Sequence, residues 1–219
     1  KYQRVSAISS DVTQRLAAAG GGQEGLASGR AAVTAVWSPA GGVGKTTVAL
    51  ALAINRAAAG KRAVFLELEP FSAAPVLFRE PGQSISTVFE KLDADTALLC
   101  QGIRQQDAAT GVYYFGRPRN YDDMNLLTQA DVTTLIEGCA AHADEVIVDL
   151  GSACGPLTRR VLELADRVLL AVDGSTVCQS KCGQFRTQHD LYAAIAGKLT
   201  VAANRGARNA AAPGEQCVS

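Results

Sequence analysis

The sequence predicts an α/β protein in which a mainly parallel sheet carries helices on both faces. Short runs rich in β-branched residues alternate with longer segments rich in alanine and leucine, and this alternation is typical of parallel strands joined by helical crossovers. The runs 146–148 (VIV) and 168–172 (VLLAV) are apolar throughout, as expected for central strands that are buried on both sides. With 219 residues, 47% hydrophobic and 19% charged, the chain has the composition of a folded domain with a sizeable core.

The individual elements follow from the same alternation, and right-handed crossovers are expected between the parallel strands. The predicted strands are Val33–Trp37, Ala63–Leu68, Gly111–Phe115, Glu145–Leu150, Arg167–Val172 and Leu199–Ala203. The predicted helices are Lys45–Ala59, Ile85–Leu92, Thr96–Gln105, Gln129–His142, Pro156–Leu164 and Val177–Ala196.

Residues 1–30 differ in composition from the rest of the chain. A short helix is predicted at Val12–Ala19, and it is followed by the glycines at 20–22 and further small residues. Such a glycine-rich stretch is typical of a flexible linker. We therefore expect residues 1–30 to join a preceding domain to a single domain over residues 31–219, which is cut short at its C-terminus.

Charge and cysteine content exclude some classes of function. Lys and Arg number 21, and so do Asp and Glu, so the net charge is zero. This balance argues against a chain that coats nucleic acid or an anionic membrane by bulk charge. The six cysteines form no Cys-x-x-Cys pair, which favours reduced thiols in a cytoplasmic protein. Cys178, Cys182 and His189 could share one helix face, but their spacing matches no familiar zinc pattern.

The stretch SPAGGVGKTT, residues 38–47, carries the main functional signal. A glycine-rich loop follows the first predicted strand and leads directly into a helix, which is the context that a phosphate-binding loop requires. Glycines let backbone N–H groups curl around an anion, and the helix N-terminus adds its positive dipole end. Lys45 is expected to reach the β- and γ-phosphates, and the Thr46 hydroxyl to bind Mg²⁺. The residues expected to bind nucleotide here are Gly41, Gly42, Val43, Gly44, Lys45, Thr46 and Thr47.

A second signal is the run Glu145–Gly151, EVIVDLG, which resembles a Walker B strand. An apolar strand that ends in aspartate brings a carboxylate to the edge of the sheet where ligands of open α/β sheets bind. Asp149 is therefore expected to hold Mg²⁺ and to take part in hydrolysis, and the Gly151 N–H to sense the γ-phosphate. Together with the glycine loop, this run predicts a P-loop NTPase domain with three layers.

The GGVGKTT core resembles the deviant Walker A motif of the ParA/MinD family of ATPases. In that family a lysine directly precedes the glycine pair and reaches across a dimer to the partner's nucleotide. The matching residue here is Ala40, and Pro39 stands where the general pattern has glycine. The resemblance therefore implies ATP and Mg²⁺ as ligands and a homodimer, with hydrolysis that is slow or impaired. Arg117, Arg159 and Arg160 are candidate substitutes for the missing charge.

The family resemblance, which covers about residues 31–205, assigns further residues. The family carries Asp-x-Asp at the end of the second strand, and Glu67 and Glu69 fall on those positions. Residues two apart on a strand point the same way, so both carboxylates can face the nucleotide, Glu67 toward Mg²⁺ and Glu69 toward the attacking water. The alternative is two solvated acids. Asn204 matches an asparagine that reads the adenine edge, with Arg205 beside it, although a turn-forming asparagine is the alternative.

Within the family, the TadZ/CpaE-like pilus-assembly branch is the most similar. The SP-x-GGVGKTT start, the Tyr114–Pro118 stretch and the segment from Asp122 to Leu127 all resemble that branch. Its members carry a receiver-like domain before the ATPase, and the first residues of this chain resemble the join to such a domain. The branch implies a switch that acts in the cytoplasm, or at the pole or inner membrane through pilus or secretion proteins.

Three other functions remain open from the sequence. A DNA-partitioning ATPase would require a basic surface, which zero net charge does not favour. A non-hydrolysing interaction module would bind ATP without releasing phosphate. A dinucleotide dehydrogenase is disfavoured because no Gly-x-Gly-x-x-Gly follows the first strand.

Overall fold

The computed structural model describes residues 30–92, 95–204 and 217–218. The predicted helix Val12–Ala19, the glycine-rich linker and Arg205 lie outside the described residues.

The described part of the chain forms one eight-stranded sheet with the order β3-β4-β2-β5-β1-β6-β7-β8. All neighbouring strands are parallel except the pair of β3 and β4, which is antiparallel. The prediction of a mainly parallel α/β fold is confirmed. The strands are β1 (Ala32–Trp37), β2 (Ala63–Leu68), β3 (Gln105–Gln106), β4 (Tyr113–Tyr114), β5 (Glu145–Leu150), β6 (Arg167–Val172), β7 (Leu199–Ala203) and β8 (Cys217–Val218).

Helices connect the strands and cover both faces of the sheet. The α-helices are α2 (Lys45–Ala58), α3 (Ala74–Leu77), α4 (Ser86–Phe89), α5 (Thr96–Ile103), α6 (Gln129–Ala140), α7 (Pro156–Leu164), α8 (Thr176–Arg186) and α9 (His189–Ile195). Two 3₁₀ turns, η1 (Tyr121–Met124) and η2 (Ala196–Lys198), complete the described elements. Helix α6 has a capping box, in which Thr128 and Asp131 bond to each other's backbone N–H groups.

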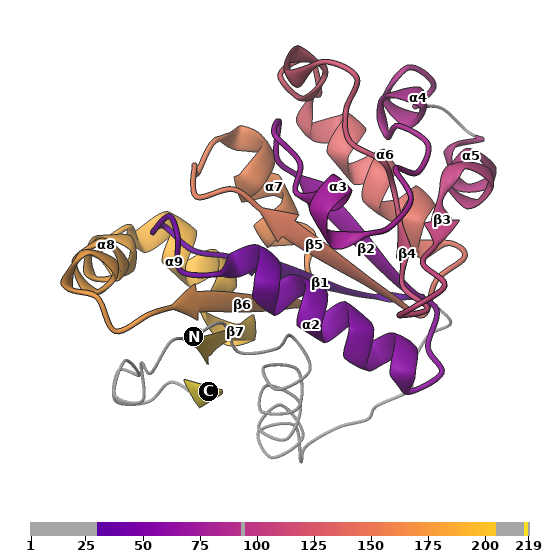
Figure 1. Ribbon diagram of the computed structural model, residues 1–219. Helices are drawn as coiled ribbons and strands as arrows, with labels where there is room; N and C mark the ends of the chain where they lie inside the picture. The colour runs from indigo at the N-terminus through magenta and orange to yellow at the C-terminus, as the bar shows by residue number, and fades with distance from the viewer. Residues whose placement is uncertain (1–29, 93–94, 205–216, 219) are drawn as a thin grey trace.

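Two apolar clusters, one on each face, hold the layers together. On one face α2 packs its alanine- and leucine-rich side on Val36, Phe65, Ile147 and Leu169 of the four central strands. On the other face α5, α6, α7, α8 and α9 cover alternate residues of the same strands. Figure 1 shows α2 lying along one face of the sheet, with α6 and α7 on the opposite face. The period-two alternation in each strand sends successive side chains to the two clusters.

The order of the strands fixes where a ligand can bind. Strand β1 lies between β5 and β6. From β1 the chain passes through α2 to β2, which lies beyond β5. From β5 the chain passes through α7 to β6, on the other side of β1. The carboxyl ends of β1 and β5 meet at this switch point, where Val36 is in register with Asp149. Open α/β sheets bind ligands at such points. The glycine loop and Asp149 are therefore neighbours in space.

The prediction of one helix over Val177–Ala196 is wrong, because the chain leaves the helix at Thr187 and Gln188. The Thr187 hydroxyl donates to the Gln184 carbonyl oxygen at 2.7 Å, and the Thr187 N–H donates to the same oxygen at 3.1 Å. A side chain that bonds the helix backbone in this way competes with the regular ladder. Gln188 has ψ 79°, which is not helical. Its carbonyl oxygen then accepts the first hydrogen bond of α9, from the Tyr192 N–H at 2.8 Å. His189 therefore lies on a different helix from Cys178 and Cys182, and the three do not share one face.

Two shorter elements also differ from the predictions. Helix α4 spans Ser86–Phe89 of the predicted Ile85–Leu92, and strand β4 spans Tyr113–Tyr114 of the predicted Gly111–Phe115. After Tyr114 the chain pairs instead with the segment before α4: the Gly116 N–H donates to Gln83 at 2.7 Å, and Ile85 donates to the Gly116 carbonyl at 3.1 Å. Those bonds satisfy backbone groups that a longer strand would have used.

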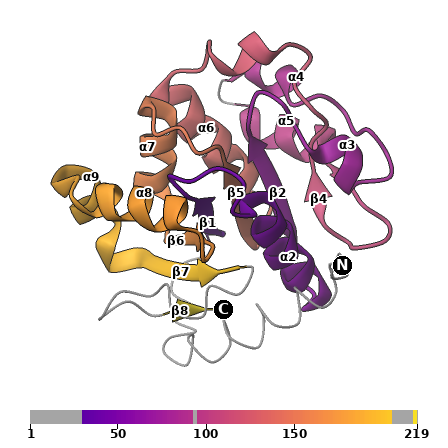
Figure 2. The same cartoon turned by 60° about the vertical axis from the view of Figure 1, so that its left-hand side comes forward.

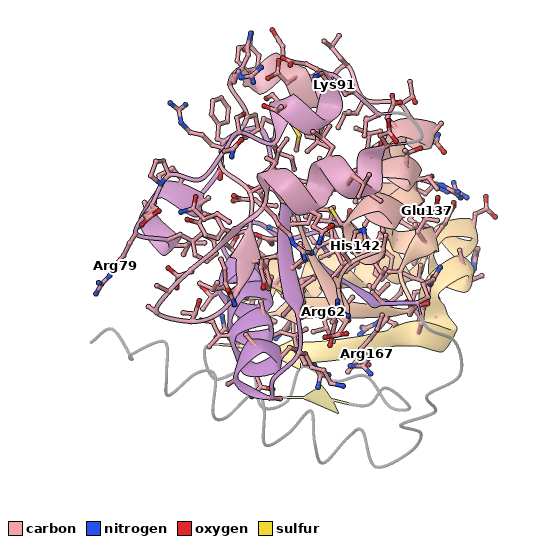
Figure 3. The ribbon with its side chains drawn as sticks, turned by 90° about the vertical axis from the view of Figure 1, so that its right-hand side faces the viewer. Arg62, Arg79, Lys91, Glu137, His142 and Arg167 are labelled. Atoms are coloured by element: carbon pink, nitrogen blue, oxygen red, sulfur yellow. The ribbon has the colours of Figure 1, made fainter. Side chains whose placement is uncertain are left out.

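At the amino ends of the strands, basic side chains are paired with carboxylates. Arg62, labelled in Figure 3, donates to both oxygens of Asp144, at 3.2 and 2.8 Å. This pairing holds the pKa of Asp144 at about 2, below its ordinary 3.8. Arg56 pairs with Glu145 at 2.8 Å on the same side of the molecule. This end of the sheet is thus partly neutralised.

Among the described residues, none of the helices has both the length and the apolar character needed to cross a bilayer.

Candidate nucleotide site

The loop after β1 has the backbone geometry that its glycines allow. Gly42 and Gly44 have φ of 74° and 92°, in the left-handed region that side chains disfavour. Apart from the adjacent residues, no atom of the described region lies within 4 Å of where a Cβ of Gly41 or Gly42 would be, and both glycines are exposed. The Ala40 N–H donates to the Ser38 hydroxyl at 3.2 Å, which fixes the start of the loop. The loop thus borders open space on its glycine side, where an anion can approach the backbone.

Lys45, the first residue of α2, is held across the loop by a residue that the sequence did not indicate. Its ammonium donates to the Ser152 hydroxyl at 2.9 Å, and that hydroxyl donates to the Ala40 carbonyl at 3.0 Å. Only 8% of Lys45 is exposed. Ser152 therefore joins the loop after β5 to both ends of the glycine loop, and it holds the Lys45 side chain back over that loop.

Asp149 is the least satisfied polar side chain of the described region. It is fully buried, and neither of its carboxylate oxygens has a hydrogen-bond partner among the described residues. The pKa of Asp149 is raised from 3.8 to about 7, chiefly by burial. The negative charges of Glu67 and Glu69 also raise this pKa, whereas the Thr46 hydroxyl and the Lys45 ammonium lower it. A buried acid without a partner costs free energy unless a proton or a cation accompanies it.

The two glutamates of β2 lie beside Asp149 but have different surroundings. Glu67 is in register with Asp149 on the neighbouring strand. Its carboxylate accepts from the Ala73 N–H at 2.7 Å and from the Ser72 hydroxyl. Desolvation nevertheless raises its pKa. Glu69 approaches Gly151, where a Cβ would lie 3.5 Å from its Oε1. The structure thus brings both glutamates to the loop, with Glu67 already used in fixing the turn before α3.

The donor set fits a magnesium ion that is bound together with phosphates and water. In the described region no three His, Cys, Asp or Glu side chains are grouped so that they could hold a metal ion by themselves. The orphaned carboxylate of Asp149, the Thr46 hydroxyl and the nearby Glu67 are hard oxygen ligands, which Mg²⁺ prefers, and Mg²⁺ usually completes its shell with phosphates and water. These residues would hold the ion, which would supply charge stabilisation at the phosphates.

Asn204 lies at the loop, on the side opposite to Ser152. Its side-chain amide donates to the Val43 carbonyl at 3.0 Å, so it supports the backbone of the glycine loop from the end of β7. The described contacts thus place Asn204 among the residues that shape the loop. Its predicted role at the adenine edge stays a prediction, as does that of Arg205.

Comparison with known proteins gives the fold a name. The sequence matches no protein-family model and no curated protein. Among solved structures it is similar to a ParA family ATPase from Chlorobium tepidum TLS, with 20% identity, a TM-score of 0.64, and 81% of this chain and 75% of that chain covered. It is also similar to the cell division ATPase MinD from Pyrococcus furiosus, with 13% identity, a TM-score of 0.61, and coverage of 84% and 76%. This chain has the ParA/MinD fold.

The ParA/MinD fold also occurs in an enzyme of another kind. A cobyrinic acid a,c-diamide synthase from Mycobacterium smegmatis, with bound ADP and magnesium, is 21% identical with a TM-score of 0.56, and 78% of this chain and 72% of that chain are covered. Identities this low show the fold alone. A nucleotide site in this chain is therefore supported by its own glycine loop, by Lys45 and Asp149, and by the residues around them.

The glycine loop and the acids near it carry recognisable sequence patterns, whereas two serines that bond to them in this ParA/MinD fold do not. Ser152 carries the Lys45 ammonium, and Ser72 bonds Glu67. Both follow an acid-bearing strand by a few residues, and a small hydroxyl residue there is common in ordinary turns. The contacts become visible only when β1, β2 and β5 are brought together in the sheet.

Replacing Gly44 by alanine is expected to damage the loop in two ways. The new Cβ would lie 2.3 Å from the Asn204 amide nitrogen, and φ of 92° is strained for any side chain. We expect the free energy of unfolding to fall by about 1–3 kcal/mol and ATP binding to weaken, measured by urea denaturation and calorimetry.

The double variant Gly44→Ala, Asn204→Ala separates the two effects of that change. Shortening Asn204 removes the clash but leaves the backbone strain, so partial recovery of stability is expected. Gly197→Ala is a matched control, because nothing lies within 4 Å of its Cβ position. Full recovery in the double variant would contradict the strain at φ, and a Gly44→Ala protein as stable as the parent would contradict both effects.

Proposed function

We propose that this protein is a Mg-ATP-binding switch of the ParA/MinD type, which dimerises when ATP is bound and hydrolyses it slowly. The observation that carries the proposal is the meeting of Lys45 and Asp149 at the carboxyl end of the sheet. Lys45 is held over the glycine loop by Ser152 at 2.9 Å, and Asp149 is buried near the Thr46 hydroxyl with neither of its oxygens in a close hydrogen bond. A triphosphate with Mg²⁺ would supply an anionic partner for Lys45 and a cationic partner for Asp149.

Slow hydrolysis follows from the residue at position 40. The side chain of Ala40 is 1% exposed and belongs to the core cluster, so it offers no charge to the nucleotide of a second protomer. Two of the candidate substitutes are already engaged: Arg159 bonds Glu163 at 2.9 Å, and Arg160 bonds Thr133 at 3.0 Å. Cations that act in trans are worth about 10³-fold or more in phosphoryl transfer, so turnover without one is slow.

The test is ATP binding and phosphate release measured over a wide range of protein concentration. We expect ATP to bind in a magnesium-dependent way and the specific rate of release to be low. A rate per protomer that rises with concentration would show that a dimer catalyses hydrolysis in spite of Ala40. Binding without any release at every concentration would overturn the enzyme and favour a nucleotide-binding interaction module.

The proposed role in positioning a pilus or secretion machine rests on the TadZ/CpaE-like segments of the sequence. The stretch Tyr114–Pro118 packs against the segment before α4, and Ser84 forms a parallel bridge with Gly116 there. This stretch therefore holds the segment before α4 in place. A fluorescent fusion of the full protein should form discrete foci that disperse in the Lys45→Ala variant. Even fluorescence along the nucleoid in the parent would favour DNA partition instead.

The charges of the described residues do not favour DNA as the partner. The three arginines Arg30, Arg56 and Arg62 at the amino ends of the strands pair with Asp166, Glu145 and Asp144, and the chain has no net charge. A partition ATPase would bind DNA with an affinity that falls steeply with salt. We expect no DNA binding at about 150 mM salt, measured by fluorescence anisotropy with a 40-base-pair duplex.

A further inference from the structure

A cavity of about 350 Å³ lies beside the glycine loop, on the face of the sheet that α8 and α9 cover. Its floor is apolar: Trp37 at the end of β1 and Phe185 of α8 are both buried and meet edge to face with ring centroids 5.1 Å apart, and Leu191 of α9 completes it. In Figures 1 and 2 the segment between β1 and α2 runs next to α8. The volume falls within the range of sites that bind small groups.

The rim of this cavity is polar and carries one positive charge. Lys181, Gln184 and Gln188 line it, and all three are exposed. None of the lining residues is an acid, and no ion pair of Lys181 is present in the described region. The cavity therefore combines an apolar floor with a cation and two amide side chains, which are complementary to an apolar group that carries a carboxylate beside it.

The same surface continues along α8 beyond the cavity. Val177 lies one helical turn before Lys181 and is 62% exposed, and Gln184 lies one turn after it, so the three follow one face of the helix. A free small molecule would fill the cavity but would leave this face uncovered. A segment of a partner protein can cover both, with one side chain in the cavity and the next along the helix.

One wall of the cavity belongs to the nucleotide site. Ser152, which bonds both Lys45 and the Ala40 carbonyl, lines the cavity together with Pro39 of the glycine loop. An occupant of the cavity therefore contacts the residue that holds the lysine. An occupant that moves Ser152 changes the affinity of the protein for the phosphates of the nucleotide. Bound nucleotide must then change the affinity of the cavity for that occupant by the same factor.

We propose that this cavity binds a segment of a partner protein in which an apolar residue is followed by Asp or Glu, and that Ser152 couples its occupancy to the nucleotide. The apolar side chain packs on the half-buried Pro39 and Leu191, above the buried rings of Trp37 and Phe185, and the carboxylate pairs with Lys181. The binding site stands on its own geometry, whereas the coupling rests on the proposed function.

The chain provides its own reporter for this site, because Trp37 is its only tryptophan. We expect acetyl-Leu-Glu-amide, titrated without nucleotide, to change the Trp37 emission saturably with a Kd on the order of 1 mM, which is typical of so small a ligand. Acetyl-Leu-Gln-amide should bind about threefold more weakly, since an exposed ion pair contributes little. No saturable change, or equal affinity for both peptides, would overturn the proposal.

Two protein variants and a free acid complete the test. Lys181→Glu should weaken binding of acetyl-Leu-Glu-amide by about tenfold, whereas Lys91→Glu, which reverses an exposed lysine after α4, should leave it unchanged. An equal loss in both variants would indicate net charge alone and would overturn the site. The acid 3-phenylpropionate should bind more weakly than the peptide; tighter binding would assign the cavity to a small metabolite and contradict a protein partner.

Cys154 gives a second readout that does not depend on fluorescence. It lines the cavity and is exposed, whereas Cys100, Cys139, Cys178 and Cys182 are buried. In a Cys217→Ser background, saturating acetyl-Leu-Glu-amide should slow the labelling of Cys154 by a maleimide about threefold or more, as occupancy shields the thiol. An unchanged labelling rate would contradict occupancy of this cavity.

The coupling is measured separately as the Kd of ATP with and without saturating peptide. We expect the peptide to change it by about fivefold or more in the parent and to have no effect in Ser152→Ala. If ATP fails to bind the parent at all, the proposed function fails while the Trp37 titration still stands. If both ligands bind without affecting each other, the coupling is wrong and the site remains.

Discussion

Replacing Lys45 by alanine is expected to weaken ATP binding by about 10- to 100-fold, because the ammonium is the main charge that the loop offers to the phosphates. Loss of a hydrogen bond to a charged group costs about 1.5–3 kcal/mol, which corresponds to that range. The fold itself should suffer little. Lys45 is a cation at the N-terminus of α2, where the helix dipole disfavours positive charge, and removing it from there offsets part of the loss of its bond to Ser152.

The measurement is calorimetric titration of ATP in the presence of magnesium, with urea denaturation of each protein beside it. Lys61→Ala is the matched control, because this exposed lysine follows the far end of the same helix. It should bind ATP as the parent does. A Lys45→Ala protein that binds ATP with unchanged affinity would show that the glycine loop is an ordinary turn and not a phosphate site.

Replacing Asp149 by asparagine is expected to stabilise the nucleotide-free protein at high pH while it weakens binding of Mg-ATP. The pKa of Asp149 is about 7 in the folded protein against an ordinary 3.8, chiefly because of burial. Between about pH 4 and pH 7 the folded protein therefore binds more protons than the unfolded chain. The free energy of unfolding consequently falls as pH rises through this window, and the loss stays constant above it.

The difference between about 7 and 3.8 corresponds to at most about 4 kcal/mol at pH 8. Asparagine keeps the shape but cannot ionise, so Asp149→Asn should lose this pH dependence and exceed the parent in stability at pH 8, with little difference at pH 4. Urea denaturation at pH 4, 6 and 8 tests this, with Asp122→Asn at an exposed site as control. Equal pH dependence in Asp149→Asn and the parent would show that another group titrates.

Lys45 and Asp149 could be predicted from the sequence, because each lies in a short local pattern at the end of an apolar strand. The apolar runs of β2, β5, β6 and β7 were predicted with their observed bounds, since β-branched residues flanked by turns leave few alternatives. The glycine loop and Asp149 followed from their position at the ends of such strands. The order of the strands, which decides that Asp149 lies next to Lys45, required the structure.

The remaining features depended on contacts between distant segments. Ser152 acts through residues more than a hundred positions away in sequence, and no local pattern marks it. The break at Thr187 arose from one hydroxyl bond to Gln184 in an otherwise helical composition. The cavity beside the loop depends on Trp37 and Phe185, which are distant in sequence and meet on one face of the sheet. Such features follow from tertiary structure and not from propensity.

The position of β1 between β5 and β6 has a consequence for how the protein is made. On the ribosome, β1 and β2 emerge before the other described strands, yet they are not neighbours in the finished sheet, because β5 inserts between them. Until residue 150 has been synthesised, both strands lack their central partner, and β1 has no strand at its other edge until residue 172. Parallel pairing over such sequence separations is slow and leaves apolar edges open to wrong partners. We therefore expect chaperones to bind the nascent chain while the residues between β2 and β6 are being synthesised.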